Sequence, residues 1–371
     1  MSLKSKNILR KIFHIFLYGF AVMGVVFVGV FVAMRLHLTD VSGSIDSRNA
    51  YFDQVKKEVK HVTKIASADT SNTESLDAVT ECQIMTISSI LPSNGQVILD
   101  TYTSTKSATV VKNMINAVML VTQNNSFLQE RMKKCDGLTD NVNSTPSNEN
   151  IFNWVSSDEW GVIHDALVKD KDVINQASHD SGVPSRVIVA SVISEQFRFF
   201  TANRESFKKY FEPLKVLGNG TRFSYGVAGV KIETAINIED NLKNTSSPFY
   251  LGPDYEHIFD PSSAESQVNH SDLLLNRLTD NTNHYYSYLY TGVFLKQIMH
   301  QWEQAGHPVN DRPEVLATLF NLGFAKSVPK DEPEVGGSTI TVNDRDYTFG
   351  GLSYEFYYSG ELADIFPLDL K

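Results

Sequence analysis

The stretch from Val183 to Phe197 constrains the fold most, because almost every residue in it is apolar. Pro184 stands at its start, where a helix leaves the backbone N–H unpaired in any case. Ser181 or Ser185 can cap the free amides of the first turn. A helix that is apolar on all sides has to be buried on all sides. The sequence therefore predicts a buried helix here.

Glu195 closes this apolar run. A carboxyl group in such a place either reaches solvent where the helix surfaces or stays partly desolvated. A desolvated carboxyl group keeps its proton to higher pH and can act as a general acid near neutral pH. Glu195 is therefore a candidate catalytic residue, to be weighed against the motifs that follow it.

A second apolar run, Ile12–Met34, is long enough to cross a bilayer as a helix. Four basic residues precede it and only Arg35 follows directly, so the N-terminus is expected in the cytoplasm. No small-x-small cleavage site precedes Arg35, which predicts an uncleaved, single-pass anchor in the cell membrane. Residues 1–11 would be a cytoplasmic tail, 12–34 the anchor, and the chain from about Leu38 extracytoplasmic.

Length and composition fit this organisation. The chain has 371 residues, enough for two domains with cores of their own. Its hydrophobic content of 42% and charged content of 20% are typical of a folded protein that carries a membrane segment. The formal net charge of −10 argues against nucleic acid as a partner.

Residues 40–135 are predicted to form a helical module, because apolar residues recur there at three- and four-residue spacing. One set runs from Phe52 to Val62, and a second apolar stretch, Leu76–Leu91, ends at a Pro-Ser-Asn-Gly turn signal. The longest set comprises Val111, Met114, Val118, Val121, Asn125, Leu128 and Met132. Two arrangements fit: a three-helix bundle, or a coiled-coil dimer in which Asn125 sets the register. The module would act as a spacer, bind a protein partner or self-associate.

The cysteines leave two alternatives open. Cys82 and Cys135 are the only two in the chain, and in an oxidising compartment they either form a disulfide or remain free thiols. No cluster of cysteine and histidine has the spacing of a metal site. We therefore expect no metal and no other cofactor.

A second helical domain is predicted after a linker. Residues 136–150 are polar and belong to a linker placed at 136–156, and Ser156 with Glu159 forms a capping-box pattern that opens a domain spanning 157–371. Near its end, residues 336–349 alternate as a short β-hairpin with its turn at Asn343-Asp344. The predicted fold class is thus mainly α, with a C-terminal hairpin.

Three motifs follow one another between about 172 and 325. They are Gly-Val-Pro before the Glu195 helix, then Gly226 with Thr234-Ala235, and finally Phe320-Asn321-Leu322-Gly323. In this order and spacing they resemble the lytic transglycosylases and goose-type lysozymes, a lysozyme-like superfamily that cleaves peptidoglycan. The chain departs from the family pattern at Gly229, where glutamine is usual, and at Phe320, where tyrosine is usual.

The resemblance implies a reaction and a set of residues. Glu195 would protonate the glycosidic oxygen of the β-1,4 bond between MurNAc and GlcNAc. It would then accept a proton from the C6 hydroxyl of MurNAc, which closes a 1,6-anhydro ring without the second carboxylate of most glycosidases. The resemblance also implies substrate contacts by Ser224, Gly226, Asn321 and Phe320, and a tyrosine that reaches Glu195, for which Tyr357 is favoured over Tyr354 and Tyr358.

Three functions remain open at this point. The first is a membrane-anchored murein lytic transglycosylase whose partners are glycan strands and the membrane. The second is a catalytically inert peptidoglycan-binding or scaffolding protein on the same fold, which the departures at Gly229 and Phe320 keep in consideration. The third is a hydrolytic muramidase.

Overall fold

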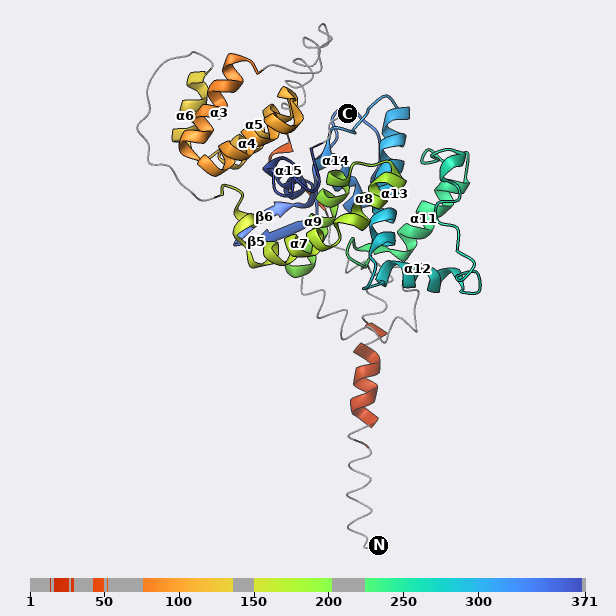
Figure 1. Ribbon diagram of the computed structural model, residues 1–371. Coiled ribbons are helices and arrows are strands. Elements are labelled where there is room, and N and C mark those ends of the chain that lie inside the picture. Colours follow the sequence, from red (N-terminus) through yellow and green to blue (C-terminus); the bar gives the residue numbers. More distant parts are fainter. Residues whose placement is uncertain are drawn as a thin grey trace, which may run out of the picture.

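The computed structural model confirms a mainly α-helical protein (Figure 1). In the part of the chain that it describes, the strands form three two-stranded antiparallel sheets. The described residues are 14, 17–26, 28–29, 43–49, 52, 76–135, 150–201 and 224–368.

Residues 76–135 form a bundle of four helices, here called the helical module. The helices are α3 (Ala78–Ile90), α4 (Pro92–Thr105), α5 (Ala108–Val121) and α6 (Ser126–Cys135). A disulfide joins Cys82 in α3 to Cys135 at the end of α6, so the first alternative for the cysteines holds. Because it closes a loop across 53 positions of sequence, this bond restricts the unfolded chain and stabilises the module.

Two expectations for the module are wrong. The apolar stretch does end before Pro92, as α3, but Pro92-Ser93-Asn94-Gly95 is not a turn, because Pro92 opens α4, where its missing N–H costs nothing. The long heptad pattern is also not one helix, because the chain breaks between Val121 and Ser126. Asn125 is exposed there, and its Oδ1 accepts a hydrogen bond from the Leu128 N–H at 3.0 Å. It starts α6 rather than setting the register of a coiled coil. Of the predicted helix between Phe52 and Val62, all but Phe52 lies outside the described residues.

Residues 150–201 and 224–368 form the large domain. Its longer helices are α7 (Asp158–Lys169), α8 (Lys171–Ser181), α9 (Ser185–Thr201), α11 (Ile232–Lys243), α12 (His270–Thr279), α13 (Tyr285–Gln304), α14 (Pro313–Leu322) and α15 (Phe349–Ser359). Single 3₁₀ turns occur at Asn153–Ser156, Pro253–Tyr255 and Phe324–Lys326. The strands are β2 (Ser224–Tyr225), β3 (Val230–Lys231), β4 (Gly336–Gly337), β5 (Thr339–Val342) and β6 (Arg345–Thr348).

The domain begins earlier than the sequence predicted. Trp154, which was placed in the linker 136–156, is fully buried and packs edge-on against Trp160 of α7. Helix α7 is capped by Ser157, whose Oγ accepts a hydrogen bond from the Trp160 N–H, and not by Ser156. Residues 150–156 therefore belong to the large domain.

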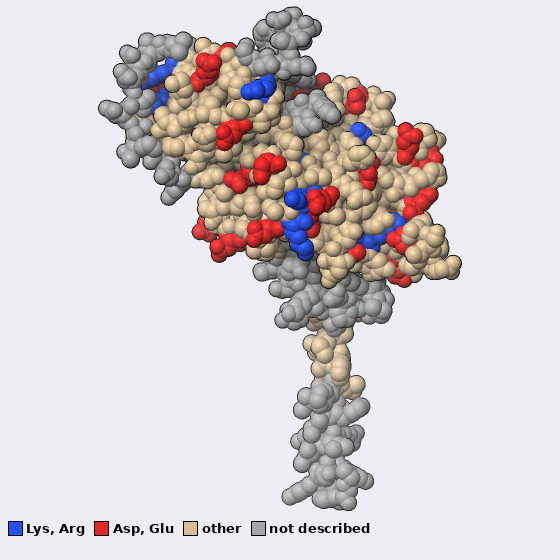
Figure 2. Space-filling model, viewed as in Figure 1, with Lys and Arg blue, Asp and Glu red and all other residues tan. Residues whose placement is uncertain are grey.

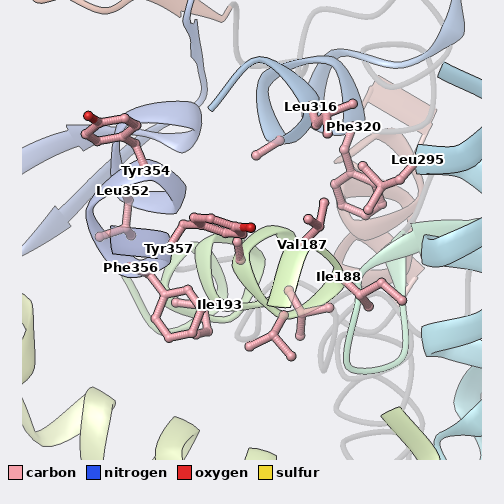
Figure 3. Close-up of a cluster of buried hydrophobic side chains, with 14 of the residues drawn as sticks. Val187, Ile188, Ile193, Leu295, Leu316, Phe320, Leu352, Tyr354, Phe356 and Tyr357 are labelled. Carbon is pink, nitrogen blue, oxygen red and sulfur yellow. The ribbon is translucent and has the colours of Figure 1, made fainter. Parts of the chain in front are cut away.

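Helix α9 is buried in the centre of this domain, as its sequence predicts. Val187, Ile188 and Ile193 are at most 3% exposed. Figure 3 shows their side chains meeting those of α13, α14 and α15, among them Leu295 and Phe320. Helix α15 lies along α9 and also packs against α5, which joins the helical module to the large domain. At the end of α15, a Cβ on Gly360 would overlap Val97 of the module, so the contact requires glycine.

Arg186, near the start of α9, holds the end of α15. Its guanidinium is fully buried and donates four hydrogen bonds of 2.8–3.1 Å to backbone carbonyls of Phe356, Tyr357, Glu361 and Phe366. These include carbonyls of the last turn of α15, which have no partner within the helix and carry its negative dipole end. Burial lowers the pKa of Arg186 to about 10, which still leaves the side chain charged at neutral pH.

Residues 43–49 and Phe52 form a segment that we call the N-terminal strap. The sequence assigned it to the module 40–135, but it packs on the large domain instead. Its strand β1 (Ser44–Ile45) pairs with β4, with Ser44 opposite Gly337. The Phe52 ring packs edge-on against Tyr354 of α15. No local feature of the sequence predicts this pairing, because its partner lies almost 300 positions away.

A buried charge cluster fastens the strap. The Arg48 guanidinium bonds Asp46 at 3.0 and 3.2 Å and Glu355 of α15 at 2.8 Å. Burial alone would raise the pKa of Asp46, but its bonds with Arg48 and Thr348 outweigh this effect and lower it. Burial raises the pKa of Glu355, and Arg48 offsets only part of that shift. The cluster ties strap, hairpin and α15 to one another.

The C-terminal hairpin follows its prediction. Strands β5 and β6 pair from Thr339↔Thr348 to Val342↔Arg345. Asn343 and Asp344 make the two-residue turn, with φ of 47° and 59°. Asparagine and aspartate tolerate this left-handed conformation better than other side chains do, which is why the pair marks the turn in the sequence.

The N-terminal apolar run is described only in part. Residues 14, 17–26 and 28–29 are helical with exposed side chains, and Figure 1 draws this helix apart from the other described elements. Within the described part of the chain, no helix combines the length and apolar character needed to cross a bilayer. The rest of 12–34 lies outside the described residues.

The role of Arg186 yields the first prediction. Arg186→Lys should lower the free energy of unfolding of the large domain by roughly 3 kcal/mol, because a lysine keeps the charge but leaves several buried carbonyls unpaired. Denaturation followed by tryptophan fluorescence measures this, since all three tryptophans lie in the large domain. Arg131→Lys, on partly exposed α6, is the matched control. Equal, small effects of the two changes would contradict the structural role of Arg186.

Candidate functional site

Glu195 is buried, but it does not end its helix. Its side chain is 4% exposed, whereas α9 continues past it to Thr201. Because the helix runs on, the side chains one turn later lie beside the carboxyl group rather than in solvent. The expectation that Glu195 closes a buried helix was therefore wrong about the helix end and right about burial.

The side chain one turn later is Arg198. Its Nε donates to Glu195 Oε2 at 2.8 Å, and its Nη2 contacts Oε1. The Arg198 side chain is 13% exposed, so this two-point ion pair is largely shielded from water. A guanidinium in such contact stabilises the ionised carboxylate. Sequence analysis missed this pairing, although the i, i+3 spacing of opposite charges on one helix was a usable signal.

Gly229 lies directly against the Glu195 carboxyl group. Its φ is +62°, and a Cβ placed on it would overlap Oε1 of Glu195. Next to it, the Gln196 side chain donates to the Val227 carbonyl, which fastens the turn between β2 and β3 to α9. Glycine at this position thus leaves open the space into which Glu195 points.

Asn321 lies at the end of α14 and is linked through hydrogen bonds to the start of α15 and to α9. Its Oδ1 accepts hydrogen bonds from the backbone N–H and the Oγ of Ser338, at 2.9 and 3.1 Å. Ser338 O in turn accepts from Phe349 N, and Phe349 O accepts from Ser194 Oγ at 3.0 Å. This chain of bonds runs from Asn321 to the residue before Glu195. Within the described residues, the Asn321 amide nitrogen has no hydrogen-bond partner.

Ser224 and Gly226 belong to the β2–β3 hairpin. Ser224 pairs with Lys231, and Gly226 occupies the turn with φ +66°. A Cβ on Gly226 would overlap the Leu278 carbonyl oxygen and Ser287 Oγ, so packing against α12 and α13 already requires a glycine there. The hairpin therefore bridges those helices and Glu195, and a contact of Ser224 or Gly226 with substrate stays a prediction.

Phe320 and Tyr357 are core residues in this structure. Phe320 is 9% exposed and lies among Phe294 and Phe349, at ring-centroid distances of 5.5 and 6.3 Å. Tyr357 is 1% exposed, and its ring lies 5.6 Å from the Arg186 guanidinium carbon. Arg186 precedes Glu195 by nine residues, about 13 Å along the helix axis. The expectation that Tyr357 reaches Glu195 finds no support here, since its ring lies beside Arg186, about two and a half turns of α9 before Glu195.

The arrangement offers acid–base chemistry from one carboxyl group. Across the described residues, no group of three or more histidine, cysteine, aspartate or glutamate side chains is placed to hold a metal ion. Comparisons with protein families, with curated proteins and with solved structures give no match. The resemblance to lytic transglycosylases therefore rests on the motifs alone.

The contact between Gly229 and Glu195 yields the second prediction. Gly229→Ala should destabilise the chain by about 1–2 kcal/mol through its left-handed backbone, and by a further 1–3 kcal/mol through overlap with Glu195. Gly306→Ala is the matched control, because Gly306 has φ +82° but open space around its Cβ position. Urea denaturation of both variants measures the difference. Equal losses would show that the Glu195 carboxyl group does not lie against Gly229.

Proposed function

We propose that this chain is a membrane-anchored murein lytic transglycosylase, with Glu195 as its single acid and base. The observation that carries the proposal is the bonded path from Asn321 through Ser338 and Phe349 to Ser194. It puts a carboxyl group at the same end of the α9–α15 pair as an amide nitrogen that has no hydrogen-bond partner among the described residues. An acid for the glycosidic oxygen and a donor for a sugar oxygen or N-acetyl group are what such a reaction requires.

Both proton transfers of this mechanism use the carboxyl oxygens of Glu195, and in this structure both oxygens contact Arg198. Donation to the glycosidic oxygen and acceptance from the MurNAc C6 hydroxyl each need a carboxyl oxygen that faces the glycan. The proposal therefore requires the bound glycan to separate Glu195 from Arg198 before the first step.

A specific observation favours a second candidate, an inert peptidoglycan-binding or scaffolding protein. Glu195 is nearly inaccessible and neutralised by Arg198, and Gly229 replaces the family's usual glutamine. A chain that had lost the need for a free acid would tolerate this arrangement. The two candidates share a ligand and differ in whether the glycan is cut.

The proposed location rests on the apolar run Ile12–Met34 and the basic residues before it. If the run is an anchor, the full chain should stay with membranes after extraction with alkaline carbonate. Protease added to spheroplasts should then digest the region after Leu38. Release into the supernatant would contradict the anchor, and full protection of that region would contradict the orientation.

Glu195→Gln is the decisive change for activity. It keeps the size of the side chain but removes the acid, so muropeptide release from purified peptidoglycan should fall by about 10²–10⁴-fold. Binding to sacculi should be retained. Glu233→Gln, at an exposed glutamate in α11, is the matched control and should leave release unchanged.

The products separate the three functions. Mass spectrometry of wild-type products should find 1,6-anhydro-MurNAc ends, one water lighter than hydrolysis products. Reducing ends instead would identify a hydrolytic muramidase. Binding to sacculi without any release, under conditions in which a known muramidase is active, would identify the inert protein.

A further inference from the structure

A cleft of about 410 Å³ opens where three segments meet. One wall is the strap, a second is the end of α5 with its following turn, and the third is the β5–β6 hairpin. The lining residues are Ser44–Arg48 from the strap, Leu120, Val121, Gln123 and Asn124 from the module, and Thr339 with Arg345–Thr348 from the hairpin. Its volume lies within the range of small-molecule sites.

The lining is polar but close to electrically neutral. Arg48 is neutralised by Asp46 and Glu355, and Arg345 and Asp346 supply one charge of each sign. The other polar lining groups are the hydroxyls of Ser44, Ser47, Thr339, Tyr347 and Thr348 and the amides of Gln123 and Asn124. An anionic ligand would need cations that are not already paired. Hydroxyl, amide and carboxylate groups together suit a neutral ligand with many hydroxyl groups.

One buried polar atom beside the cleft, Oε2 of Glu355, has no hydrogen-bond partner among the described residues. Glu355, fully buried behind Arg48, accepts a hydrogen bond from Arg48 with Oε1, while its Oε2 has no partner in the described part of the chain. A buried carboxyl oxygen without a partner is rare in folded proteins. Because Glu355 does not line the cleft, this oxygen is an unsatisfied position within the charge cluster and not a contact for a ligand.

The cleft adjoins the candidate active site. Ser44 lines it and pairs with Gly337, whose Cβ position lies 2.9 Å from Asn321 Oδ1. Thr339 also lines it and directly follows Ser338, which bonds Asn321. Asn321 and the cleft are thus separated by only the β1–β4 pair. A polymeric ligand that contacts Asn321 can extend to the cleft.

We propose that this cleft binds a sugar unit of the same glycan strand that contacts Glu195, away from the bond that is cut. The inference rests on the proposed function for the identity of its ligand. Because the cleft is built from module, strap and hairpin, the bound sugar holds the helical module against the large domain. Binding there raises affinity for long glycans without contributing to proton transfer.

Ser47→Trp tests the inference, because Ser47 is exposed, lines the cleft and lies outside the Glu195 region. An indole there fills part of the cleft. In the detergent-solubilised full chain, affinity for chitohexaose measured by calorimetry should fall on the order of tenfold or more. Ser93→Trp, at an exposed serine of α4 that does not line the cleft, is the matched control and should leave affinity unchanged.

A second variant, which adds no bulk, tests the inference in case the Ser47→Trp protein does not fold. Gln123→Ala with Asn124→Ala removes two exposed amides without adding bulk, and should weaken chitohexaose binding on the order of tenfold. Chitohexaose affinity that is unchanged in this variant and in a folded Ser47→Trp protein overturns the inference. If these variants lose binding while Glu195→Gln has no effect on muropeptide release, the cleft stands and the catalytic proposal fails. If muropeptide release depends on Glu195 but both cleft variants bind chitohexaose as the wild type does, the catalytic proposal stands and the cleft proposal fails.

Discussion

Arg186 fixes the register of the two central helices, and the rest of the large domain depends on that register. Its guanidinium meets the carbonyls at the end of α15, while Ser353 donates to the Ala190 carbonyl one turn further along α9. At the far end, Ser194 bonds the first residue of α15, Phe349. Antiparallel helices held at both ends cannot slide. Glu195, which follows Ser194, therefore lies where α15 begins. Asn321 is linked to the same place through Ser338.

The strap extends this scaffold toward the N-terminus. Strand β1 adds to β4 beside Asn321, and the Asp46–Arg48–Glu355 cluster fastens it to the middle of α15. If residues 12–34 cross the membrane, the nine residues 35–43 allow at most roughly 30 Å between the bilayer and β1. The membrane attachment would then act on the large domain next to the candidate site. The helical module, which the sequence places between anchor and large domain, would lie to one side of this path.

The features that sequence analysis predicted correctly depend on near neighbours. Gly182 ends α8 because only a residue that accepts φ of +67° fits there, and Asn343-Asp344 forms its turn for a related reason. The burial of α9 follows from its own composition. The features that were missed depend on distant partners. Asp46 meets Thr348 across 302 positions and Arg186 meets Tyr357 across 171, distances at which a single sequence carries no pairing signal. Asn125 was placed inside one long helix because the apolar spacing continues from α5 into α6. The spacing continues across the break because both helices pack into one core.

The lack of a side chain at Gly229 and the ion pair of Glu195 with Arg198 depend on each other. A side chain at position 229 would occupy the space that the carboxyl group now fills, and would turn it away from its present contact with Arg198. The glycine therefore permits a closed state in which Glu195, the candidate acid, is both buried and neutralised by Arg198. Opening that state costs an ion pair that is largely shielded from water, so a ligand must supply the free energy through contacts elsewhere. Under the proposed function, a neutral glycan that reaches Asn321 and the cleft beyond β1 would have such contacts to offer. A short sugar that reaches only Glu195 would not, so the proposal favours long strands over fragments.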